Sequence, residues 1–451
     1  MEKTFLTGFS RSDVTPQLGV HISGYYQIRI ADGVLDPLEV NTMAFSDGTS
    51  TALIISVDTL HLPDEYCDSL RTRIAARCDI SADSVFIAST HTHTGPLVGS
   101  SSESEAVSNP LYEQFLATRI EDSAVTALAD LKPSRVFFGT SQAPKISFVR
   151  RFRMKTGEVR TNPGVGNPNI AHPIGDVDET VQLVRFVREG GNDIAIVNFP
   201  VHPDTIGGCK ISADYPGFVR RSLEKALDDV NCIFLNGAQG DVNHVNVNAK
   251  GGDLNGLETE TFDDVARGYE HSRHMGRVIA GAVLQIWDKL DETNPGKVLF
   301  GRKIIKLPSS RVSADRVHEA EKIIEIHERG DDHLLPWEGM ELTTAVAEAY
   351  RMKRLENGPD FFDLPLSAVG FGDVMWLGIP GEPFTAIGKG IKAGSPFTLT
   401  SPCCLTNGAI GYFPTKDAYD EGGYEARSSV FAAGVAENII EGAVDLLKSL
   451  K

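Results

Sequence analysis

Residues 84–97 read SVFIASTHTHTGPL, a short apolar run that breaks into two histidines and a Gly-Pro pair. The apolar run, 85–88, predicts a buried strand, and the Gly-Pro pair predicts the end of the loop that follows it. Loops that leave the carboxyl ends of strands line the binding crevice of α/β proteins, and alternation in an extended segment sends His91 and His93 to the same side. The stretch therefore predicts an α/β layer with either a metal site or two backbone-bonded loop histidines at its edge.

The composition of the chain excludes several classes of partner. The chain has 451 residues and a formal net charge of −18, which repels nucleic acid and anionic lipid head groups at long range. No run approaches the roughly 20 apolar residues of a membrane helix, and residues 1–16 lack the apolar core of a signal peptide. Six cysteines without CxxC spacing suit reduced thiols. We expect a cytoplasmic protein with no nucleic-acid partner and no stable membrane association.

The same pattern, an apolar strand followed directly by a polar side chain, recurs later in the chain. Residues 193–201 form an apolar run that is followed by His202 and a proline, and residues 366–380 predict a hairpin that is followed by Glu382. Two neutral histidines and a carboxylate suit Zn²⁺ with one position left open for water. A zinc ion in such a site lowers the pKa of water toward about 7 and polarises a carbonyl, so hydrolysis is the natural chemistry.

A fourth strand exit, at residues 232–248, is rich in glycine. Residues 232–248, CIFLNGAQGDVNHVNVN, end an apolar run in a turn that contains Asp241, Asn243 and His244. Glycines on both sides let the backbone approach another group closely, and amides in such a turn can bind an oxyanion or orient a carboxylate. An Asx turn with no further function would give the same pattern.

Residues 145–164, KISFVRRFRMKTGEVRTNPG, are a basic island in an acidic chain. The Thr-Gly pair predicts a hairpin that carries Arg150, Arg151 and Arg153. These cations would either discourage sheet pairing on a solvated edge strand or grip an acidic or carbonyl group of a substrate.

Strand and helix patterns alternate along the chain and predict an α/β fold, with mixed β-sheets flanked by helices and a metal site at converging strand-exit loops. Asp58, at the end of a strand, is a candidate to support a metal ligand or to form a turn, and Asp214 is expected to cap a helix. Strands are expected at 40–46, 51–57, 180–187 and 193–201, and helices at 63–78, 110–131, 258–289 and 428–450.

Five ordered motifs make the sequence similar to one family. STHTHTGP, FPVHP, the NGAQGDVN turn, GEPF and the GY…GGYEA segment occur in the order seen in the neutral, non-lysosomal ceramidases, which are zinc amidohydrolases that cleave the N-acyl bond of ceramide. The opening SRSDVTPQLGVHISGY resembles that family as well. The resemblance implies a single ceramidase-like catalytic domain over residues 1–451. Within it we expect a helical excursion at 311–357 and a carboxyl-terminal portion, 397–451, that supplies tyrosines and the closing helix.

The resemblance also implies roles for individual residues. His93 matches a histidine beside the metal that contacts substrate or the reacting oxygens, and Tyr424 matches a tyrosine that stabilises the oxyanion. Arg150 matches a substrate-side arginine, although Arg151 matches almost as well. Proton transfer would fall to His93, or otherwise to Asp241 or His244. The implied zinc ligands are His91, His202, Glu382 and Tyr412.

Three departures from the family point away from ceramide. Asn243 stands where the family has a serine that is essential on ceramide, and His244 stands where proline is usual. The chain stops one helix after GGYEA, which leaves no room for the family's immunoglobulin-like domain, and it has no secretion signal. We therefore expect a divergent member that acts on a polar small molecule.

The sequence predicts a zinc-dependent hydrolase that cleaves an amide (N-acyl) or ester bond through metal-activated water. One alternative is a zinc enzyme that acts on a carbohydrate or a lactone ring. The other is an inactive, metal-binding relative, which the missing serine favours. Neither the substrate nor the oligomeric state follows from the sequence.

Overall fold

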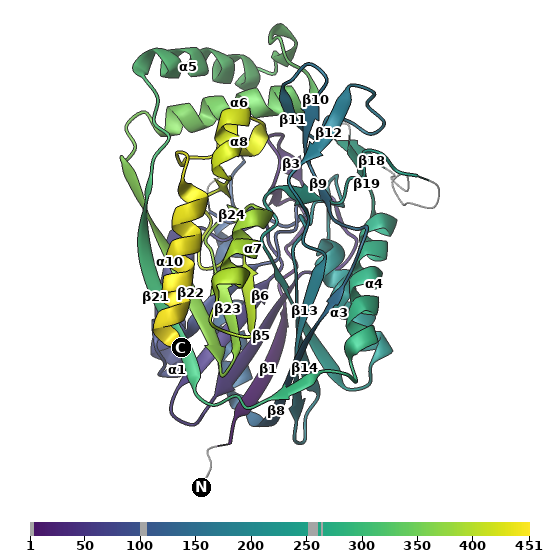
Figure 1. Cartoon of the computed structure of the whole chain (residues 1–451), viewed down its shortest axis with the longest axis vertical. Coiled ribbons are helices and arrows are strands. Elements are labelled where there is room, and N and C mark those ends of the chain that lie inside the picture. The colour runs from purple at the N-terminus through teal and green to yellow at the C-terminus, as the bar shows by residue number, and fades with distance from the viewer. Residues whose placement is uncertain (1–3, 100–105, 251–259, 263–264) are drawn as a thin grey trace.

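Two β-sheets pack face to face and helices cover their outer faces, in a computed structural model that describes residues 4–99, 106–250, 260–262 and 265–451 (Figure 1). The predicted α/β fold with mixed sheets flanked by helices is confirmed.

The larger sheet has the strand order β16-β14-β13-β8-β1-β5-β6-β7, with β20 paired to β8. Most neighbours are antiparallel, but β6 with β7 and β14 with β16 are parallel. Its strands are β1 (Leu6–Asp13), β5 (Glu39–Ser46), β6 (Thr51–Val57), β7 (Val85–Ser89), β8 (Lys132–Gln142), β13 (Thr180–Arg188), β14 (Asp193–Phe199), β16 (Val230–Asn236) and β20 (Asp291–Thr293).

The smaller sheet has the order β21-β22-β23-β25 and packs on the larger one. One buried apolar cluster joins the two sheets, with Phe45, Phe86 and Phe186 from the larger sheet and Phe371 and Trp376 from the smaller. The smaller sheet consists of β21 (Val298–Pro308), β22 (Phe361–Phe371), β23 (Val374–Gly378) and β25 (Leu399–Cys403).

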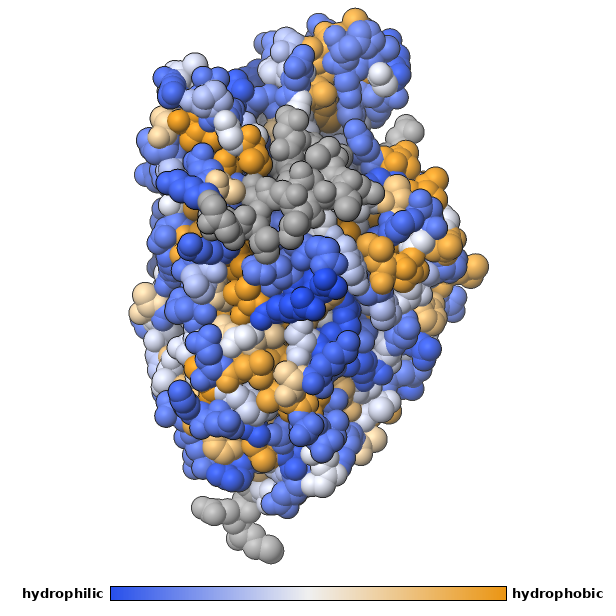
Figure 2. All heavy atoms as spheres, turned by 90° about the vertical axis from the view of Figure 1, so that its right-hand side faces the viewer, coloured by the Kyte–Doolittle hydropathy of each residue, from blue (hydrophilic) through white to orange (hydrophobic). Residues whose placement is uncertain are grey.

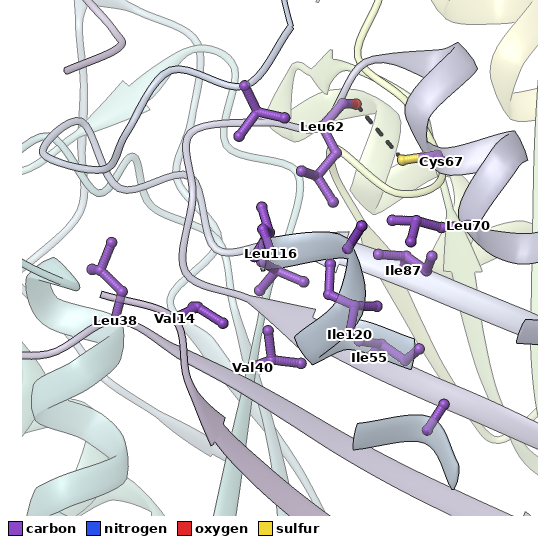
Figure 3. Close-up of a cluster of buried hydrophobic side chains, with 14 of the residues drawn as sticks. Val14, Leu38, Val40, Ile55, Leu62, Cys67, Leu70, Ile87, Leu116 and Ile120 are labelled. Atoms are coloured by element: carbon purple, nitrogen blue, oxygen red, sulfur yellow. Dashed lines mark hydrogen bonds between the residues drawn. The ribbon is translucent and has the colours of Figure 1, made fainter. Parts of the chain in front are cut away.

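Helices cover the outer faces because the sheet residues there are apolar as well. Figure 3 shows one such cluster, in which Leu70 of α1 and Leu116 and Ile120 of α2 pack on Val40 and Ile55 of the larger sheet. A second cluster joins the same sheet to α3 and α4, and a third joins the smaller sheet to α7 and α10. These helices are α1 (Asp64–Cys78), α2 (Pro110–Ala129), α3 (Asp214–Ala226), α4 (Tyr269–Ile286), α7 (Thr385–Gly394) and α10 (Val435–Leu450).

Two helix starts differ from the expected ones. The expected helix 258–289 begins only at Tyr269, because a short hairpin, β18 (Glu260–Phe262) with β19 (Val265–Arg267), precedes it; residues 258–259 lie outside the described residues. The expected helix 428–450 begins at Val435, after Gly434 with φ of 101°. A left-handed residue cannot continue a helix, so the chain turns there before α10.

Residues 311–357 contain α5 (Ala314–Glu328), the 3₁₀ turn η2 (Asp332–Leu334) and α6 (Gly339–Arg354). The two helices share a small apolar cluster of their own that includes Ile324 and Met352. They cross the top of the molecule in Figure 1 above α8. The segment is attached to the body through α6, which packs against the short helix α9.

Short elements connect these layers. They are β2 (His21–Ile22), β3 (Arg29–Ile30), β4 (Gly33–Val34), η1 (Ala82–Ser84), β9 (Phe148–Val149), β10 (Arg151–Met154), β11 (Val159–Thr161), β12 (Ile170–Ile174), β15 (Lys210–Ile211), β17 (Val242–Asn243), β24 (Glu382–Pro383), β26 (Tyr412–Phe413), α8 (Lys416–Glu421) and α9 (Tyr424–Ser428).

Within the part of the chain that the structure describes, no helix is long and apolar enough to cross a membrane. On the face shown in Figure 2, apolar residues are interrupted by hydrophilic ones.

Candidate metal centre and active site

Three strand exits bring four of the predicted side chains together. His91 and His93 follow β7, and His202 follows β14. Glu382 lies in β24, shortly after β23 of the smaller sheet. All four residues are buried, and none is more than 8% exposed. The site therefore lies where the ends of both sheets meet.

The three imidazoles face one point. The His91 Nε2 atom lies 3.0 Å from His202 Nε2 and 3.4 Å from His93 Nε2, and His202 Nε2 lies 3.1 Å from His93 Nε2. Zinc–nitrogen distances of 2.0–2.1 Å place two ligands of a tetrahedron about 3.3 Å apart. The spacing of these nitrogens thus fits a single metal ion, and each of the three histidines offers a ring nitrogen within 4.8 Å of the others.

Backbone carbonyls hold two of the rings in place. Leu60 O lies 2.8 Å from His91 Nδ1, and Gly24 O lies 3.1 Å from His93 Nδ1. A carbonyl only accepts, so each Nδ1 carries the proton and each Nε2 keeps its lone pair for a metal or a substrate. Gly24 has φ of 106°, and a Cβ there would lie 2.7 Å from His93 Nδ1, so a side chain at residue 24 would displace the ring.

Glu382 supplies an anionic oxygen beside the histidines. Its Oε2 atom lies 3.3 Å from His91 Nε2 and accepts a hydrogen bond from Gln239 Nε2 at 3.3 Å. Burial by itself raises the pKa of this carboxyl, but the neighbouring His91 and then Arg150 outweigh burial and lower the pKa to about 2. The residues therefore offer two overlapping ligand sets, which share His91 and His202 and differ in whether His93 or Glu382 completes them.

Tyr412 joins this centre through the backbone. It pairs with Glu382 in the parallel bridge between β24 and β26. The Arg150 guanidinium lies 5.3 Å from the centroid of its ring. Burial, and then the Glu382 charge, raise the pKa of Tyr412 well above its usual value, so without a cation the phenol keeps its proton.

Arg150 rather than Arg151 lies beside the centre. Arg150 Nη2 donates to Gly240 O at 2.6 Å, and Arg150 Nε pairs with Glu425 Oε1 at 2.6 Å. Arg151 instead pairs with Glu421 at 3.1 Å. The hairpin thus directs one of the two predicted arginines to the site and the other to the protein body.

Tyr424 lies across from the histidines. It begins α9, and its backbone N–H donates to Thr161 Oγ1 at 3.1 Å. Its hydroxyl lies 3.5 Å from the hydroxyl of Tyr26, and its ring centroid lies 5.7 Å from that of Tyr412. Tyr26 and Tyr424 therefore line the same pocket as His93 and His202.

Two pockets open on either side of these tyrosines, and both are lined by Tyr26, Tyr412 and Tyr424. The histidine-side pocket holds about 110 Å³ and the glutamate-side pocket about 460 Å³. The histidine-side pocket is lined by His93, Arg150, His202, Asp204, His327 and Asp332, among others. The glutamate-side pocket is lined by His61, Asp64, Tyr350, Arg351, Arg354 and Glu382, among others.

Asp241 and His244 line neither pocket. Asp241 accepts hydrogen bonds from the backbone N–H and the hydroxyl of Thr385, at 2.7 and 2.8 Å. His244 is buried, with its ring centroid 5.2 Å from that of His271. The structure thus does not bring either predicted proton carrier to the histidine cluster.

The glycine-flanked turn has a packing role. Gly240 N donates to Pro383 O at 2.9 Å, and a Cβ on Gly240 would lie 2.5 Å from Glu382 O. The predicted close approach is therefore between this turn and the strand that carries Glu382.

Asn243 lies behind the histidine-side pocket. Its Nδ2 donates to Asn162 Oδ1 at 2.8 Å, and its Oδ1 accepts from Val245 N at 3.0 Å. Asn162 lines the pocket, whereas Asn243 does not. Asn243 is thus placed to position Asn162 rather than to touch a substrate.

Asp58 supports the loop that carries His91. The carboxylate of Asp58 accepts from Thr90 Oγ1 at 3.1 Å and forms a buried ion pair with Arg220 at 2.5 Å. Asn236 Nδ2, at the end of β16, donates to Thr90 O at 3.4 Å. These contacts tie the β6 and β16 exits to the residue before His91.

Asp214 supports the loop after His202. Its Oδ2 accepts from the backbone N–H groups of Thr205 and Ile206, at 2.8 and 3.0 Å, and its Oδ1 accepts from Ser272 Oγ at 2.7 Å. Asp214 is itself the first residue of α3, so the expectation of a helix-capping aspartate was wrong. The carboxylate turns back to the loop because the N–H groups of Thr205 and Ile206 are buried and have no strand partner.

Sequence reasoning missed several residues of the site. His61, at the exit of β6, followed the same pattern as His91 and could have been found; burial, and then His91, lower its pKa to about 4. Tyr26 and Asp204 had no local signal, because tertiary packing alone brings them to the site, whereas Gln239 and Glu425 lie within the NGAQGDVN and GGYEA motifs and could have been found.

Two solved structures share this architecture. One is neutral ceramidase from Pseudomonas aeruginosa, with a TM-score of 0.71 and 15% sequence identity over 100% of this chain and 75% of that chain. The other is a ceramidase complexed with C2, with a TM-score of 0.71 and 16% identity over 99% and 76% of the two chains. No protein-family model matches the sequence. The chain thus has the neutral ceramidase fold, as the sequence resemblance predicted.

Proposed function

We propose that this chain, which has the fold of the neutral ceramidases, is a zinc-dependent hydrolase that cleaves the amide (N-acyl) bond of a polar small molecule. The buried cluster of His91, His93 and His202, with the Glu382 carboxylate 3.3 Å from His91 Nε2, carries the proposal. Three nitrogens and one carboxylate oxygen are donors that suit zinc.

His91, His202 and Glu382 would hold the ion, with Tyr412 as a fourth ligand. A buried divalent cation requires negative charge nearby, and Glu382 supplies it because its pKa, lowered to about 2, keeps it ionised. When bound, the zinc ion supplies Lewis-acid polarisation of a carbonyl and lowers the pKa of water toward about 7.

The remaining side chains would act on the substrate. Tyr424 would donate its hydroxyl proton in a hydrogen bond to the carbonyl oxygen as negative charge develops there. His93 Nε2, whose lone pair faces the cluster, would take a proton from the attacking water and pass it to the leaving amine. Arg150, paired with Glu425, would hold the Tyr412 ring in position.

A small polar group on one side of the scissile bond is favoured by the histidine-side pocket. Its volume of about 110 Å³ is below the range of about 300–1,000 Å³ that drug-sized ligands occupy. Gln27, Asn162 and Asp204 add polar groups to its wall.

Metal content and hydrolysis measured on the same samples test the proposal. We expect about one zinc per chain, with hydrolysis of short N-acyl amines or the corresponding esters lost on chelation and restored by zinc. His91→Ala should lose both metal and activity, and His172→Ala, an exposed histidine on the β12 hairpin, should keep both. Full activity in metal-free protein would contradict the proposal.

A second candidate is a zinc enzyme that acts on a carbohydrate or a lactone. The combination of tyrosines with Gln27, Asn162 and Asp204 around the histidine-side pocket suits a hydroxylated ring. Screening acetylated amino sugars and lactones beside N-acyl amines separates the two candidates. An inactive relative would bind zinc and turn over none of these compounds.

A further inference from the structure

The α5–α6 segment forms the roof of both pockets. Met340, Leu342 and Val346, at the start of α6 and along it, line the histidine-side pocket, and Tyr350 and Arg351, further along the helix, line the glutamate-side pocket. Figure 1 shows α5 and α6 crossing the end of the molecule. A substrate that reaches the histidine cluster therefore contacts this segment.

The roof is joined to the helix that carries Tyr424. Arg427, on the same short helix α9, donates from Nε and Nη2 to Glu348 Oε2 of α6, at 2.8 and 2.6 Å. A guanidinium with two hydrogen bonds to one carboxylate oxygen restricts the relative position of the two helices. The roof thus has a fixed place relative to Tyr424.

One polar pair in the roof faces the histidine-side pocket. His327, at the end of α5, and Asp332, in η2, both line it, and His327 Nδ1 lies 2.8 Å from Asp332 Oδ1. The carboxylate only accepts, so His327 Nδ1 donates its proton to Asp332, and a neutral ring in this orientation has its lone pair on Nε2. The pair therefore offers acceptors, namely His327 Nε2 and the second oxygen of Asp332.

The rest of the pocket supports a small donor group beside a short apolar one. Asp204 adds a second carboxylate, whose Oδ1 accepts from the Tyr25 hydroxyl at 2.6 Å, while Met340 and Leu342 add an apolar wall. The charge of Arg150 is balanced by Glu425, so it does not offset the two aspartates. With about 110 Å³, the pocket has room for a chain of a few atoms, whereas a larger acyl part would occupy the glutamate-side pocket of about 460 Å³.

We propose that His327 and Asp332 are specificity-determining residues that select N-acyl substrates whose amine part is a short chain ending in a hydrogen-bond donor, either a hydroxyl or an ammonium group. This inference rests on the proposed amide hydrolysis and names its substrate class. The donor group hydrogen-bonds to the His327–Asp332 pair, and this contact sets the scissile bond beside Tyr424 and the histidine cluster.

Three amides of equal length test the proposal with the zinc-loaded full chain. N-acetylethanolamine ends in a hydroxyl, N-acetylethylenediamine in an ammonium, and N-propylacetamide in a methyl group. We expect kcat/KM for at least one of the first two to exceed that for the third by about fivefold or more, the size of one to two hydrogen bonds. If the enzyme prefers only the ammonium compound over N-propylacetamide, the carboxylates cause the selectivity. If it prefers both the hydroxyl and the ammonium compound, His327 causes it.

Substitutions test whether His327 and Asp332 cause the preference for amides that end in a donor group. His327→Leu and Asp332→Asn should lower kcat/KM for the preferred amide by about fivefold, mostly through KM, and leave N-propylacetamide unchanged. His318→Ala is the matched control, because His318 lies on the same helix with 70% of its side chain exposed. An equal loss on all three amides would mean a structural role and would overturn the inference.

A binding measurement keeps this inference separate from the proposed function. Saturation-transfer NMR of the three amides should show that wild type and His318→Ala bind the preferred amide. His327→Leu should bind that amide more weakly. Selective binding without turnover would contradict amide hydrolysis but support the pocket's selectivity for donor groups. Equal binding of all three amides, or tighter binding of N-propylacetamide, would overturn the inference.

Discussion

The Nε atom of Arg150 lies 2.6 Å from Oε1 of Glu425, and the two side chains are only 6% and 0% exposed. Burial by itself lowers the pKa of Arg150, but Tyr412 and Glu425 outweigh burial and raise it, so the guanidinium stays charged. The pair joins the basic hairpin to the helix that begins at Tyr424. It therefore fixes the two tyrosines of the site relative to each other.

Glu425→Gln should destabilise the protein by about 3 to 5 kcal/mol, because it leaves the Arg150 charge buried without a partner. Chemical denaturation measures the free energy of unfolding. Glu292→Gln breaks an exposed pair with Arg135 and should cause no measurable change. Equal stability of both variants would mean that the buried pair does not anchor the hairpin.

The two overlapping ligand sets make opposite predictions for metal content. We expect Glu382→Gln to lose most of the bound zinc, whereas His93→Ala should keep most of it and lose hydrolysis by about a hundredfold or more, the usual effect of removing a proton-transfer group. Metal analysis after dialysis checks both variants. Loss of zinc in His93→Ala with zinc retained in Glu382→Gln would make His93 the third ligand instead.

Asn243→Ala should lower kcat by a modest factor, about two- to tenfold, because it removes the hydrogen bond that holds Asn162 at the pocket wall. Asn243→Ser should behave in the same way, since a serine hydroxyl is shorter than the amide that spans Asn162 Oδ1 and Val245 N. Steady-state kinetics on the best substrate checks both. A large gain of activity in Asn243→Ser would mean that residue 243 contacts the substrate.

Asp58→Asn should cost about 1 to 3 kcal/mol of stability, because Arg220 would lose one of its two charged partners and keep only Glu39, at 3.2 Å. It should also weaken zinc binding, since Asp58 holds Thr90, the residue before His91. Denaturation and metal titration measure the two effects. Asp32→Asn, whose exposed carboxylate pairs with Lys210, is the control and should change neither.

The stability of the chain should depend on Asp178 at acid pH. Burial by itself raises its pKa, but Lys392, at 2.7 Å, and hydrogen bonds with Thr180 outweigh burial and hold the pKa below its usual value of 3.8. A depressed pKa in the folded state gives stability that is present above about pH 4 and is lost as the pH falls through that folded value.

Asp178→Asn should therefore lose less unfolding free energy than wild type when the pH is lowered from about 5 to 3. Denaturation curves at several pH values measure the difference. Asp363→Asn, at an exposed position of β22, should follow the wild-type curve. Parallel curves for wild type and Asp178→Asn would contradict the lowered pKa.

The sequence by itself determined the local part of this protein. Apolar runs that end in polar residues marked β7, β14 and β23, and they placed His91, His202 and Glu382 at strand exits, because burial imposes an apolar pattern on each strand separately. The family motifs added Tyr412 and Tyr424, which no periodicity would have selected.

Only the tertiary structure decided what surrounds those residues. Gly24 O meets His93 Nδ1, and Glu425 meets Arg150, across separations of 69 residues and more. His327 of the roof reaches the same pocket. Such contacts depend on how sheets and helices pack, and packing constrains size and polarity at each position without leaving a periodic signal in the chain. That is why the position of His91, His202 and Glu382 at strand exits could be predicted from the sequence, whereas the carbonyls, ion pair and roof that surround them and shape the pockets could not.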